Sequence, residues 1–479
     1  MEKEICDEIL TIFKNLSQIP RKSGHEEKVS QYLYEEIKAF NLTVVKDAFG
    51  NIIAEKPAAI GFEHLPVTIL QAHMDMVCVA ADGVDFNPLK DAIKVKCEDG
   101  YLFAEGTSLG ADDGIGVAAI LYLLKTKFNH GPLRAIFTVD EEDGMTGAKN
   151  LDEKYLQASY LINCDSEDVD LLTVSSAGSI NVDFSRTLDL VKSNKNLALE
   201  VNVKGLLGGH SGMEINCGRA NAIKVAGLFL EHLTQEGVAY DLIHICGGTA
   251  RNSIPAYAKI QIAIDNKSEA TVRQVQEQIK TYLKSVYAGI EKSTDIVVQK
   301  IDLPTQVMSA AMKEDLVTLI NLMHTGVYAM SSSIKGLVES SANLGVIETT
   351  KDKILVKFFP RSSFNEVIEN FKIVGNKLAK ATNFNVEFSS QSPAWPENLH
   401  SRLATVLNDE FKKLANVPMK KESIHAGLEC SWFYQKNKEL DMVSVGPTVT
   451  NVHSPKEKLQ VDTLAVHVNV IKNALAKLV

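Results

Sequence analysis

The chain has 479 residues, 45% of them hydrophobic and 23% charged, a composition that suits a globular protein with room for two or more domains. Its formal net charge of −10 disfavours nucleic acids and anionic membranes as partners. No stretch reaches the roughly 18 consecutive apolar residues of a membrane helix, and the first residues lack the apolar core of a signal peptide. Because seven cysteines without a CxxC pair also argue against a disulfide framework, we expect a cytoplasmic protein.

Helices and strands are predicted to alternate over the first part of the chain. After an opening amphipathic helix, Ser23 and Glu26 stand at capping-box spacing ahead of a helix expected over about 24–39. The segment TVVKDAFGNIIAEK is typical of two short strands around a Phe-Gly-Asn turn, and VTILQAHMD of a strand that begins at Val67. A buried helix, GIGVAAILYLLK, and two further strands, RAIFTVD and YLINCD, follow. This alternation predicts an α/β layer with a largely parallel sheet.

The pattern changes at about Asn181. Alternating strands such as NLALEVNVKG, YAKIQIAID, TDIVVQKID and KILVKFFPRS are separated by helices, which predicts an α+β domain of antiparallel strands with helices on one face. The proline-containing segment SSQSPAWPENLHS is interpreted as a linker, and two helices, HSRLATVLNDEFKKL and VDTLAVHVNVIKNALAKLV, follow it. We therefore predict a discontinuous first domain, residues 1–180 and 391–479, into which a second domain, residues 181–390, is inserted.

Imidazole and carboxylate side chains lie where predicted strands end or the next helix begins. They are His73 and Asp75 in QAHMDMV, Asp112 and Asp113 in SLGADDGIGV, Glu141 and Glu142 in TVDEEDG, and Asp165 in LINCDSED. In an open α/β sheet these positions face the ligand crevice. An isolated carboxylate there would be a solvated loop residue, but so many acids in one crevice need cations to offset their repulsion. We therefore predict a divalent metal site.

The donor types narrow the choice of metal. Histidine with carboxylates and without thiolates suits catalytic zinc, and manganese or cobalt can bind similar ligands. Two metals that share a bridging carboxylate would need about three protein ligands each, which requires one more histidine. The candidate is His453 in VGPTVTNVHSPKEKL, within a loop marked by Gly446, Pro447 and Pro455.

Five motifs in this order, HMD, GADDGIG, DEEDG, CDSED and VHSPKE, closely resemble those of metallopeptidase family M20, and in particular of its aminoacyl-histidine dipeptidase branch. The resemblance covers nearly the whole chain. It implies an α/β catalytic domain with a largely parallel sheet, of the phosphorylase/hydrolase-like, zinc-peptidase type, and an inserted α+β lid domain. It also implies two divalent metal ions, zinc with cobalt or manganese as alternatives, and hydrolysis of dipeptides, Xaa-His (carnosine-like) dipeptides above all.

The resemblance also implies which residues bind the metals. The expected set is His73 and Asp165 on the first metal, Glu142 and His453 on the second, and Asp112 as the bridge between them. Each metal would then have three protein ligands.

Further roles near the metals follow from the same resemblance. Asp75 would orient and polarise the first histidine, and Glu141 would be the general base that takes a proton from the water between the metals. Asp113 stands where many relatives have Asn, and the peptide bond before it would be cis. Asp140 and Asp143 have no assigned role beyond turn formation.

The inserted domain carries matching residues as well. His210 in GLLGGHSG resembles the lid histidine that stabilises the oxyanion of the tetrahedral intermediate, although a loop histidine between glycines would look the same. Asn252 in GGTARNSIP, Arg361 in FFPRSS and Gly427 in HAGLECS resemble substrate-binding residues. Arg361 would receive the terminal carboxylate of the substrate, unless it is an ordinary surface residue. Lid closure would have to bring His210 and Arg361 over the metals.

Several alternatives stay open. The substrate could be a broader range of di- and tripeptides or an N-acylated amino acid, because the metal motifs are shared across the family. A non-catalytic relative would lack a ligand or the base, and a two-metal phosphoesterase would add cationic groups near the metals. His425 and Glu429 in HAGLECS are weaker candidates for the pocket. The expected partner is a small peptide substrate, and whether the insert also forms a homodimer is left open.

Overall fold

The chain folds into two compact units. This computed structural model describes residues 2–478. The first unit comprises the chain up to Ser176, Trp395–Ile424 and the chain from Leu428 onward, and the second comprises Ala177–Ala394 and His425–Gly427. The sequence places the boundaries near residues 180 and 390 and assigns the short segment 425–427 to the first domain. In the structure this segment is part of the second unit.

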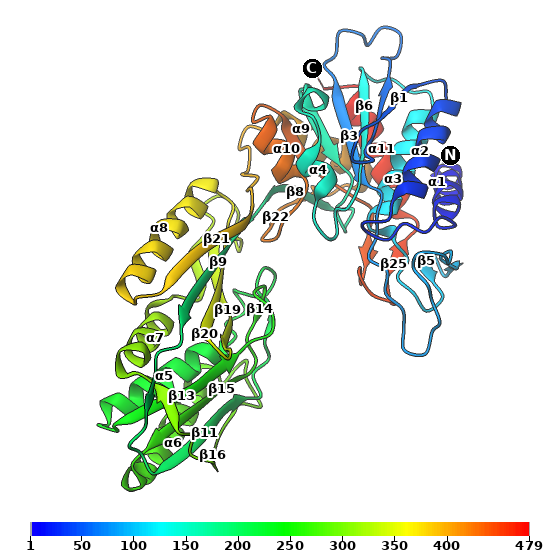
Figure 1. Ribbon diagram of the computed structural model, residues 1–479. Helices are drawn as coiled ribbons and strands as arrows, with labels where there is room; N and C mark the ends of the chain where they lie inside the picture. Colours follow the sequence, from blue (N-terminus) through cyan, green and yellow to red (C-terminus); the bar gives the residue numbers. More distant parts are fainter. Residues whose placement is uncertain (1, 479) are drawn as a thin grey trace. The chain divides into compact units, whose positions relative to one another are not determined.

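The first unit is built on an eight-stranded mixed sheet (Figure 1). In spatial order its strands are β1 (Thr43–Lys46), β2 (Ile52–Lys56), β6 (Leu133–Thr138), β3 (Thr68–His73), β7 (Tyr160–Asn163), β23 (Asp441–Ser444), β8 (Leu171–Ser176) and β22 (Lys420–Ile424). The central strands β6, β3, β7 and β23 run parallel, as does the outer pair β8–β22. The pairs β1–β2, β2–β6 and β23–β8 are antiparallel. The predicted α/β class with a largely parallel sheet is confirmed.

Helices cover both faces of this sheet. Figure 1 shows α1 (Glu2–Leu16), α2 (Glu27–Ala39) and α3 (Ala111–Lys125) on one side of β3 and β6, and α4 (Thr146–Asn150) and α10 (Cys430–Lys436) on the other. Two helices late in the chain, α9 (Arg402–Ala415) and α11 (Thr463–Leu475), complete the unit. All six residues of β3 are buried, because a central strand covered on both faces has no polar side. None of the described helices has the combination of length and apolar character needed to span a bilayer.

A second, four-stranded sheet of this unit presents the last predicted metal ligand. Its strands are β24 (Val449–Thr450), β25 (Lys458–Gln460), β5 (Tyr101–Ala104) and β4 (Val95–Glu98), in spatial order. His453 lies in the connection between the antiparallel strands β24 and β25. Because β25 also pairs with β5, this hairpin is fixed to the segment of chain that leads into α3.

The second unit is a nine-stranded sheet with helices on one face (Figure 1). In spatial order the strands are β16 (Asp295–Ile301), β11 (Leu197–Lys204), β15 (Ala258–Ile264), β13 (Tyr240–Gly247), β19 (Val338–Thr349), β20 (Lys353–Ser362), β9 (Gly178–Thr187) and β21 (Asn385–Ser392), with β18 (Gly326–Met330) paired to β19. Every pairing is antiparallel. The helices are α5 (Ala222–Gln235), α6 (Glu269–Val286), α7 (Ala310–Leu322) and α8 (Asn365–Ala381). The predicted α+β insert is confirmed.

Apolar packing joins the strands and helices of this unit. A single cluster of buried side chains includes Val201 of β11, Phe229 of α5, Val275 of α6 and Leu316 of α7. Two short pairs lie outside the main sheet: β10 (Leu190–Lys192) with β17 (Gln306–Met308), and β12 (Gly209–His210) with β14 (Ser253–Ile254). The second of these pairs carries the predicted lid histidine.

One local prediction is wrong. The helix α2 starts at Glu27 without a side-chain cap, and the Ser23 hydroxyl instead donates to Asp75 Oδ2 at 2.8 Å. The capping box does not form because the buried carboxylate of Asp75 accepts the hydrogen bond of the Ser23 hydroxyl. The segment interpreted as a linker does contain the boundary between the two units, at Ala394 and Trp395, although its first residues belong to β21 and Trp395 is buried and bridged to Ser176.

Candidate metal centre

The predicted ligands meet at one edge of the first sheet because three neighbouring strands run parallel. His73 is the last residue of β3 and pairs with Thr138, the last residue of β6. Glu141 and Glu142 lie in the turn beyond β6 rather than in the strand itself, and Asp165 follows the end of β7 by two residues. Since parallel strands end at the same edge, these side chains converge.

The carboxylate of Asp112 lies between two histidines. Its Oδ1 is 3.1 Å from His73 Nε2, and its Oδ2 is 3.0 Å from His453 Nε2. Asp165 Oδ1 is 3.5 Å from His73 Nε2, and Glu142 Oε1 is 2.9 Å from His453 Nε2. The five predicted ligands thus form two groups of three that share Asp112.

The spacing of these donor atoms fits divalent metals. Two ligands that each lie about 2.0–2.2 Å from a tetrahedral zinc ion are about 3.3 Å apart, which the N–O distances of 2.9–3.5 Å resemble. The donor atoms of His73, Asp112 and Glu142 all lie within 4.8 Å of one another, and so do those of His73, Asp113 and Asp165. His73 is in both of these clusters, and the first cluster also contains Glu142, so the two groups of ligands adjoin at Asp112.

Burial makes this group of acids electrostatically costly without a counter-charge. Only 15% of the Asp112 side chain and 12% of the Asp165 side chain are exposed. Burial, with repulsion between carboxylates added to it, raises the pKa of Glu141 and of Asp165 well above the ordinary range. Hydrogen bonds to Asp112 and Glu142 raise the pKa of His453 to about 11. Nearby positive charge would stabilise the ionised form of these buried carboxylates, and divalent cations would supply that charge.

The turn that carries Glu141 and Glu142 is held by side chains that accept its backbone N–H groups. Asp75 Oδ1 accepts from Glu141 N at 3.0 Å, and its Oδ2 accepts from Glu142 N at 3.2 Å. Glu26 Oε1 accepts from Asp140 N at 3.1 Å, and Asn51 Oδ1 accepts from Val139 N at 3.2 Å. Four successive N–H groups are therefore fixed by three side chains.

Asp140 takes part in the same turn, whereas Asp143 is exposed. Asp140 has a positive φ of 57°, and its carboxylate accepts from the Thr146 hydroxyl. Asp140 thus shapes the turn between β6 and α4.

The start of α3, which carries Asp112, is held in a comparable way. The peptide bond between Asp112 and Asp113 is cis, as the resemblance implies. Asp113 Oδ2 accepts from His73 N at 3.3 Å and its Oδ1 from Gly116 N at 3.2 Å. A side chain at Gly116 would collide with that carboxylate. Because both oxygens of Asp113 already accept backbone N–H groups, we assign it to positioning rather than to a metal.

Sequence reasoning missed Arg21. Its guanidinium is 1% exposed and donates to the carbonyls of Met74 at 3.2 Å, Asp75 at 2.8 Å and Gly110 at 2.5 Å. A side chain at Gly114 would collide with it, which explains one glycine of the GADDGIG motif. Nothing in the sequence marks Arg21, because its partners are backbone carbonyls of distant loops.

Glu457 was also missed, although it stands within the VHSPKE motif. Its carboxylate is 2% exposed and accepts hydrogen bonds from the backbone of the segment that contains Asp112. The weaker candidate Glu429 is fully buried, and its Oε2 accepts from Gln71 at 2.5 Å and from Thr138 at 2.8 Å. Burial raises the pKa of Glu429 to about 7.

In the second unit, the predicted lid residues His210 and Asn252 are neighbours. His210 pairs with Ser253 in the β12–β14 bridge, and Ser211 N donates to Asn252 O at 2.8 Å. His210 Nδ1 accepts from Met213 N at 3.3 Å, so the proton of the neutral ring is on Nε2. Burial and the charge of Arg361 lower the pKa of His210, which favours that neutral ring. The side chain is therefore suited to donate a hydrogen bond.

Arg361 is buried rather than on the surface, with 7% exposure. It packs on the ring of Phe359 at 4.7 Å, and its Nε has no hydrogen-bond partner among the described residues. Burial lowers the pKa of Arg361 to about 10. A buried guanidinium with unused donors is suited to a carboxylate ligand. Gly427 lies in the half-buried part of the 425–427 segment, next but one to His425, whose Nε2 is 2.7 Å from Ser341 Oγ.

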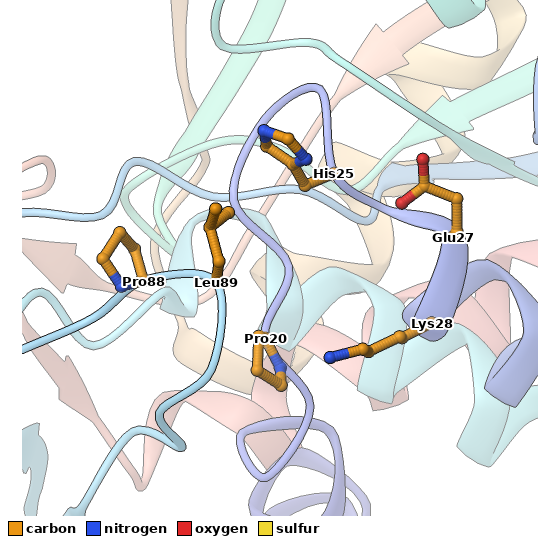
Figure 2. A pocket seen from close by; sticks show the side chains of 6 residues that line it. All are labelled: Pro20, His25, Glu27, Lys28, Pro88 and Leu89. Atoms are coloured by element: carbon orange, nitrogen blue, oxygen red, sulfur yellow. The ribbon is translucent and has the colours of Figure 1, made fainter.

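Two pockets of the structure are separate from these residues. Figure 2 shows one in the first unit, of about 120 Å³, lined by Pro20, His25, Glu27, Lys28, Pro88 and Leu89. The other, about 470 Å³ in volume, lies in the second unit near Lys224, Tyr282 and Tyr287. Neither is lined by a predicted metal ligand, and Lys224 is already bonded to three backbone carbonyls.

Comparison with known proteins decides the family. The sequence model of peptidase family M20/M25/M40 matches residues 69–477, which include every predicted metal ligand. The chain belongs to this family. It is therefore a hydrolase of the peptidase class, and the predicted membership of family M20 is confirmed.

Relatives of the M20 chain cover almost its whole length. A cytosol non-specific dipeptidase of Escherichia coli is 34% identical over 462 residues, 95% of this chain and 94% of the relative. An aminoacylhistidine dipeptidase from Vibrio alginolyticus has a solved structure with a TM-score of 0.92 and 31% identity, covering 98% of this chain and 96% of that one. The aminopeptidase PepT of Bacillus cereus, with a TM-score of 0.58 and 17% identity over 99% of this chain and 98% of that one, shares the fold.

Proposed function

We propose that this M20 chain is a cytosolic, metal-dependent dipeptidase that hydrolyses Xaa-His dipeptides. The observation that carries the proposal is the carboxylate of Asp112, whose two oxygens lie 3.1 Å and 3.0 Å from two different histidines. That is the arrangement a bridging ligand needs. Two divalent ions, zinc by preference, would be held by His73, Asp112, Asp165, Glu142 and His453. When bound, they would activate water and polarise the scissile carbonyl.

The chain's own groups would manage the proton. Glu141 would accept a proton from the attacking water and pass it to the leaving amine, so that its carboxylate is regenerated in each cycle. Its backbone N–H is fixed by Asp75 at 3.0 Å, which keeps the carboxylate beside the metal ligands. Glu142, the next residue, faces His453 instead. Two adjacent glutamates can therefore serve as base and ligand.

Residues of the second unit would bind the peptide. The Nε2–H of His210 would donate to the developing oxyanion, and Asn252 and Gly427 would hold the substrate backbone. Arg361 would receive the terminal carboxylate, for which its unpaired Nε and its burial are the support.

The choice of dipeptide rests on relatives. The Vibrio structure is named an aminoacylhistidine dipeptidase, which supports an Xaa-His substrate, and the Escherichia coli relative is named a cytosol non-specific dipeptidase. The second name favours an alternative, a broad range of dipeptides that includes Xaa-His. The name of the Escherichia coli relative also supports the cytosolic location proposed here.

One set of assays tests the proposal. Carnosine-like Xaa-His dipeptides, other dipeptides and an N-acylated amino acid are supplied to the wild-type chain and to Glu141→Gln, with and without a chelator. We expect chelator-sensitive hydrolysis of the Xaa-His dipeptides, and loss of turnover in the variant with both metals still bound. Equal rates on all dipeptides would support the broad alternative. Hydrolysis of none of these substrates, or full activity of Glu141→Gln, would overturn the assignment.

A further inference from the structure

Glu457 binds four consecutive backbone N–H groups with one carboxylate. Its Oε2 accepts from Leu109 N at 2.7 Å and Gly110 N at 3.0 Å, and its Oε1 accepts from Ala111 N at 2.7 Å and Asp112 N at 3.3 Å. The side chain is 2% exposed. Among the described residues this carboxylate has four backbone donors and no cation within hydrogen-bond distance, so backbone groups fix its position.

The four N–H groups belong to the segment that starts α3, where backbone donors lack partners within the helix. The helix dipole at this end also favours a negative charge. The residue that supplies this charge does not come from the helix itself. It comes from the connection between β24 and β25, about 350 residues further along the chain, and it lies four residues after His453.

Glu457 therefore links two segments of the chain. A pair of metals bridged by one carboxylate requires both segments to be correctly positioned. One segment carries Asp112 and the other carries His453, and the two side chains approach to 3.0 Å. We propose that Glu457 is a positioning residue that holds the bridging carboxylate of Asp112 opposite His453, so that both segments are in place before metal binds. The inference rests on the proposed function, because it takes Asp112 and His453 to be metal ligands.

The chemistry of the side chain makes substitutions informative. Glutamine keeps the size but replaces one acceptor oxygen by an NH₂ donor, so two of the four N–H groups would face a donor. Aspartate keeps the charge but is one methylene shorter, so it would reach only part of the set. We therefore expect glutamate at position 457 to hold the Asp112 segment most firmly, aspartate less firmly and glutamine least firmly.

The affinity for Zn²⁺ tests the proposed role of Glu457 independently of catalytic activity. Chelator-stripped full-length chains are titrated with Zn²⁺ in a calorimeter. We expect Glu457→Gln to weaken Zn²⁺ binding about 10- to 100-fold and Glu457→Asp to weaken it less, the range seen when groups that support metal ligands are removed. Glu410→Gln is the matched control. Its carboxylate is 3% exposed in the same unit but pairs with Lys413 and Lys477 at 2.6 Å, so the control should lose stability and keep Zn²⁺ affinity.

The possible outcomes distinguish a failure of the proposed function from a failure of the role proposed for Glu457. A wild-type chain that binds none of Zn²⁺, Co²⁺ and Mn²⁺ would overturn the proposed function itself. A wild-type chain that binds two ions, together with a folded Glu457→Gln that binds them equally well, would overturn only the role of Glu457. Should the glutamine variant fail to fold, amide hydrogen exchange of the metal-free wild type decides. Slow exchange at residues 109–112 supports the proposal, and fast exchange that becomes slow only after Zn²⁺ is added contradicts it.

Discussion

Asp75 Oδ1 accepts the backbone N–H of Glu141 at 3.0 Å. The same oxygen lies 3.4 Å from His73 Nδ1, and the second oxygen accepts from Glu142 N and from the Ser23 hydroxyl. A fully buried carboxylate thus connects the imidazole of a proposed metal ligand to the turn that carries the proposed base. The role expected for Asp75 from the sequence, orienting a histidine, describes only part of what its contacts allow.

Asp75→Asn tests this double role. Asparagine offers one acceptor oxygen where the carboxylate offers two, so its NH₂ would face the N–H group of either Glu141 or Glu142. We expect kcat to fall about 100-fold or more, because both the histidine and the base lose their orientation. Steady-state kinetics on a dipeptide measure it. Asp152→Asn, which alters an exposed carboxylate at a short helix, should leave kcat unchanged, and a similar loss there would argue against a specific effect.

Arg361→Met tests the substrate contact in the second unit. If the buried guanidinium binds the terminal carboxylate, its loss should raise KM for dipeptides about 10- to 100-fold, the equivalent of about 1.5–3 kcal/mol for a charged hydrogen bond. The diagnostic measurement compares each dipeptide with its C-terminal amide. Wild type should strongly prefer the free acid, whereas the variant should no longer distinguish the two.

Arg273→Met is the control for this test, since Arg273 lies on α6 with a 40% exposed side chain. It should keep the preference for the free acid. An undiminished preference in Arg361→Met would show that another group binds the carboxylate.

The sequence predicts residues whose partners follow from chain order. His73, Glu142 and Asp165 could be found because each stands at or just beyond the end of a recognisable apolar strand, and parallel strands place such positions at one edge. His453 could be proposed only because two metals with about three protein ligands each require a second histidine. These predictions need no knowledge of tertiary contacts beyond the sheet itself.

The residues that hold the ligands could not be predicted in this way. Glu457 and Arg21 bond to backbone groups of loops far away in the sequence, and backbone groups leave no pattern of residue types. The spacing of Ser23 and Glu26 even pointed to a local cap. In the structure the Ser23 hydroxyl bonds to Asp75, and Glu26 accepts from the Asp140 N–H as well as from the nearby Gly24 N–H, because buried partners compete with a local cap.

Arg21→Lys should destabilise the first unit while the net charge stays the same. The guanidinium bonds to carbonyls of two loops at once, and the single ammonium group of lysine cannot reach all three. Each buried carbonyl left without a donor costs about 1–3 kcal/mol. We expect the midpoint of thermal unfolding to fall by several degrees, about 2–4 °C per kcal/mol for a unit of this size. Arg402→Lys on α9, whose side chain is exposed, should change little, and an unchanged midpoint for Arg21→Lys would contradict the structural role.

His467 predicts how stability depends on pH. This residue of α11 is 3% exposed, its Nε2 has no partner among the described residues, and burial lowers the pKa of His467 to about 4. The unfolded chain binds the proton at about pH 6.5, so the full stability is present above that pH. As the pH falls from about 6.5 to about 4, the unfolded state takes up a proton that the folded state does not, and stability is lost.

His467→Leu should therefore make the chain less sensitive to acid. Between pH 7 and pH 5 the loss avoided is about 2 kcal/mol, from the roughly 1.5 pH units below the unfolded pKa at about 1.36 kcal/mol each. Thermal unfolding midpoints at pH 7 and pH 5 should differ less in the variant than in wild type. Some sensitivity should remain, because burial and the charge of Arg361 also lower the pKa of His425, to about 3. The exposed His400→Leu serves as control, and an equal drop from pH 7 to pH 5 in wild type and His467→Leu would show that His467 does not set the acid limit.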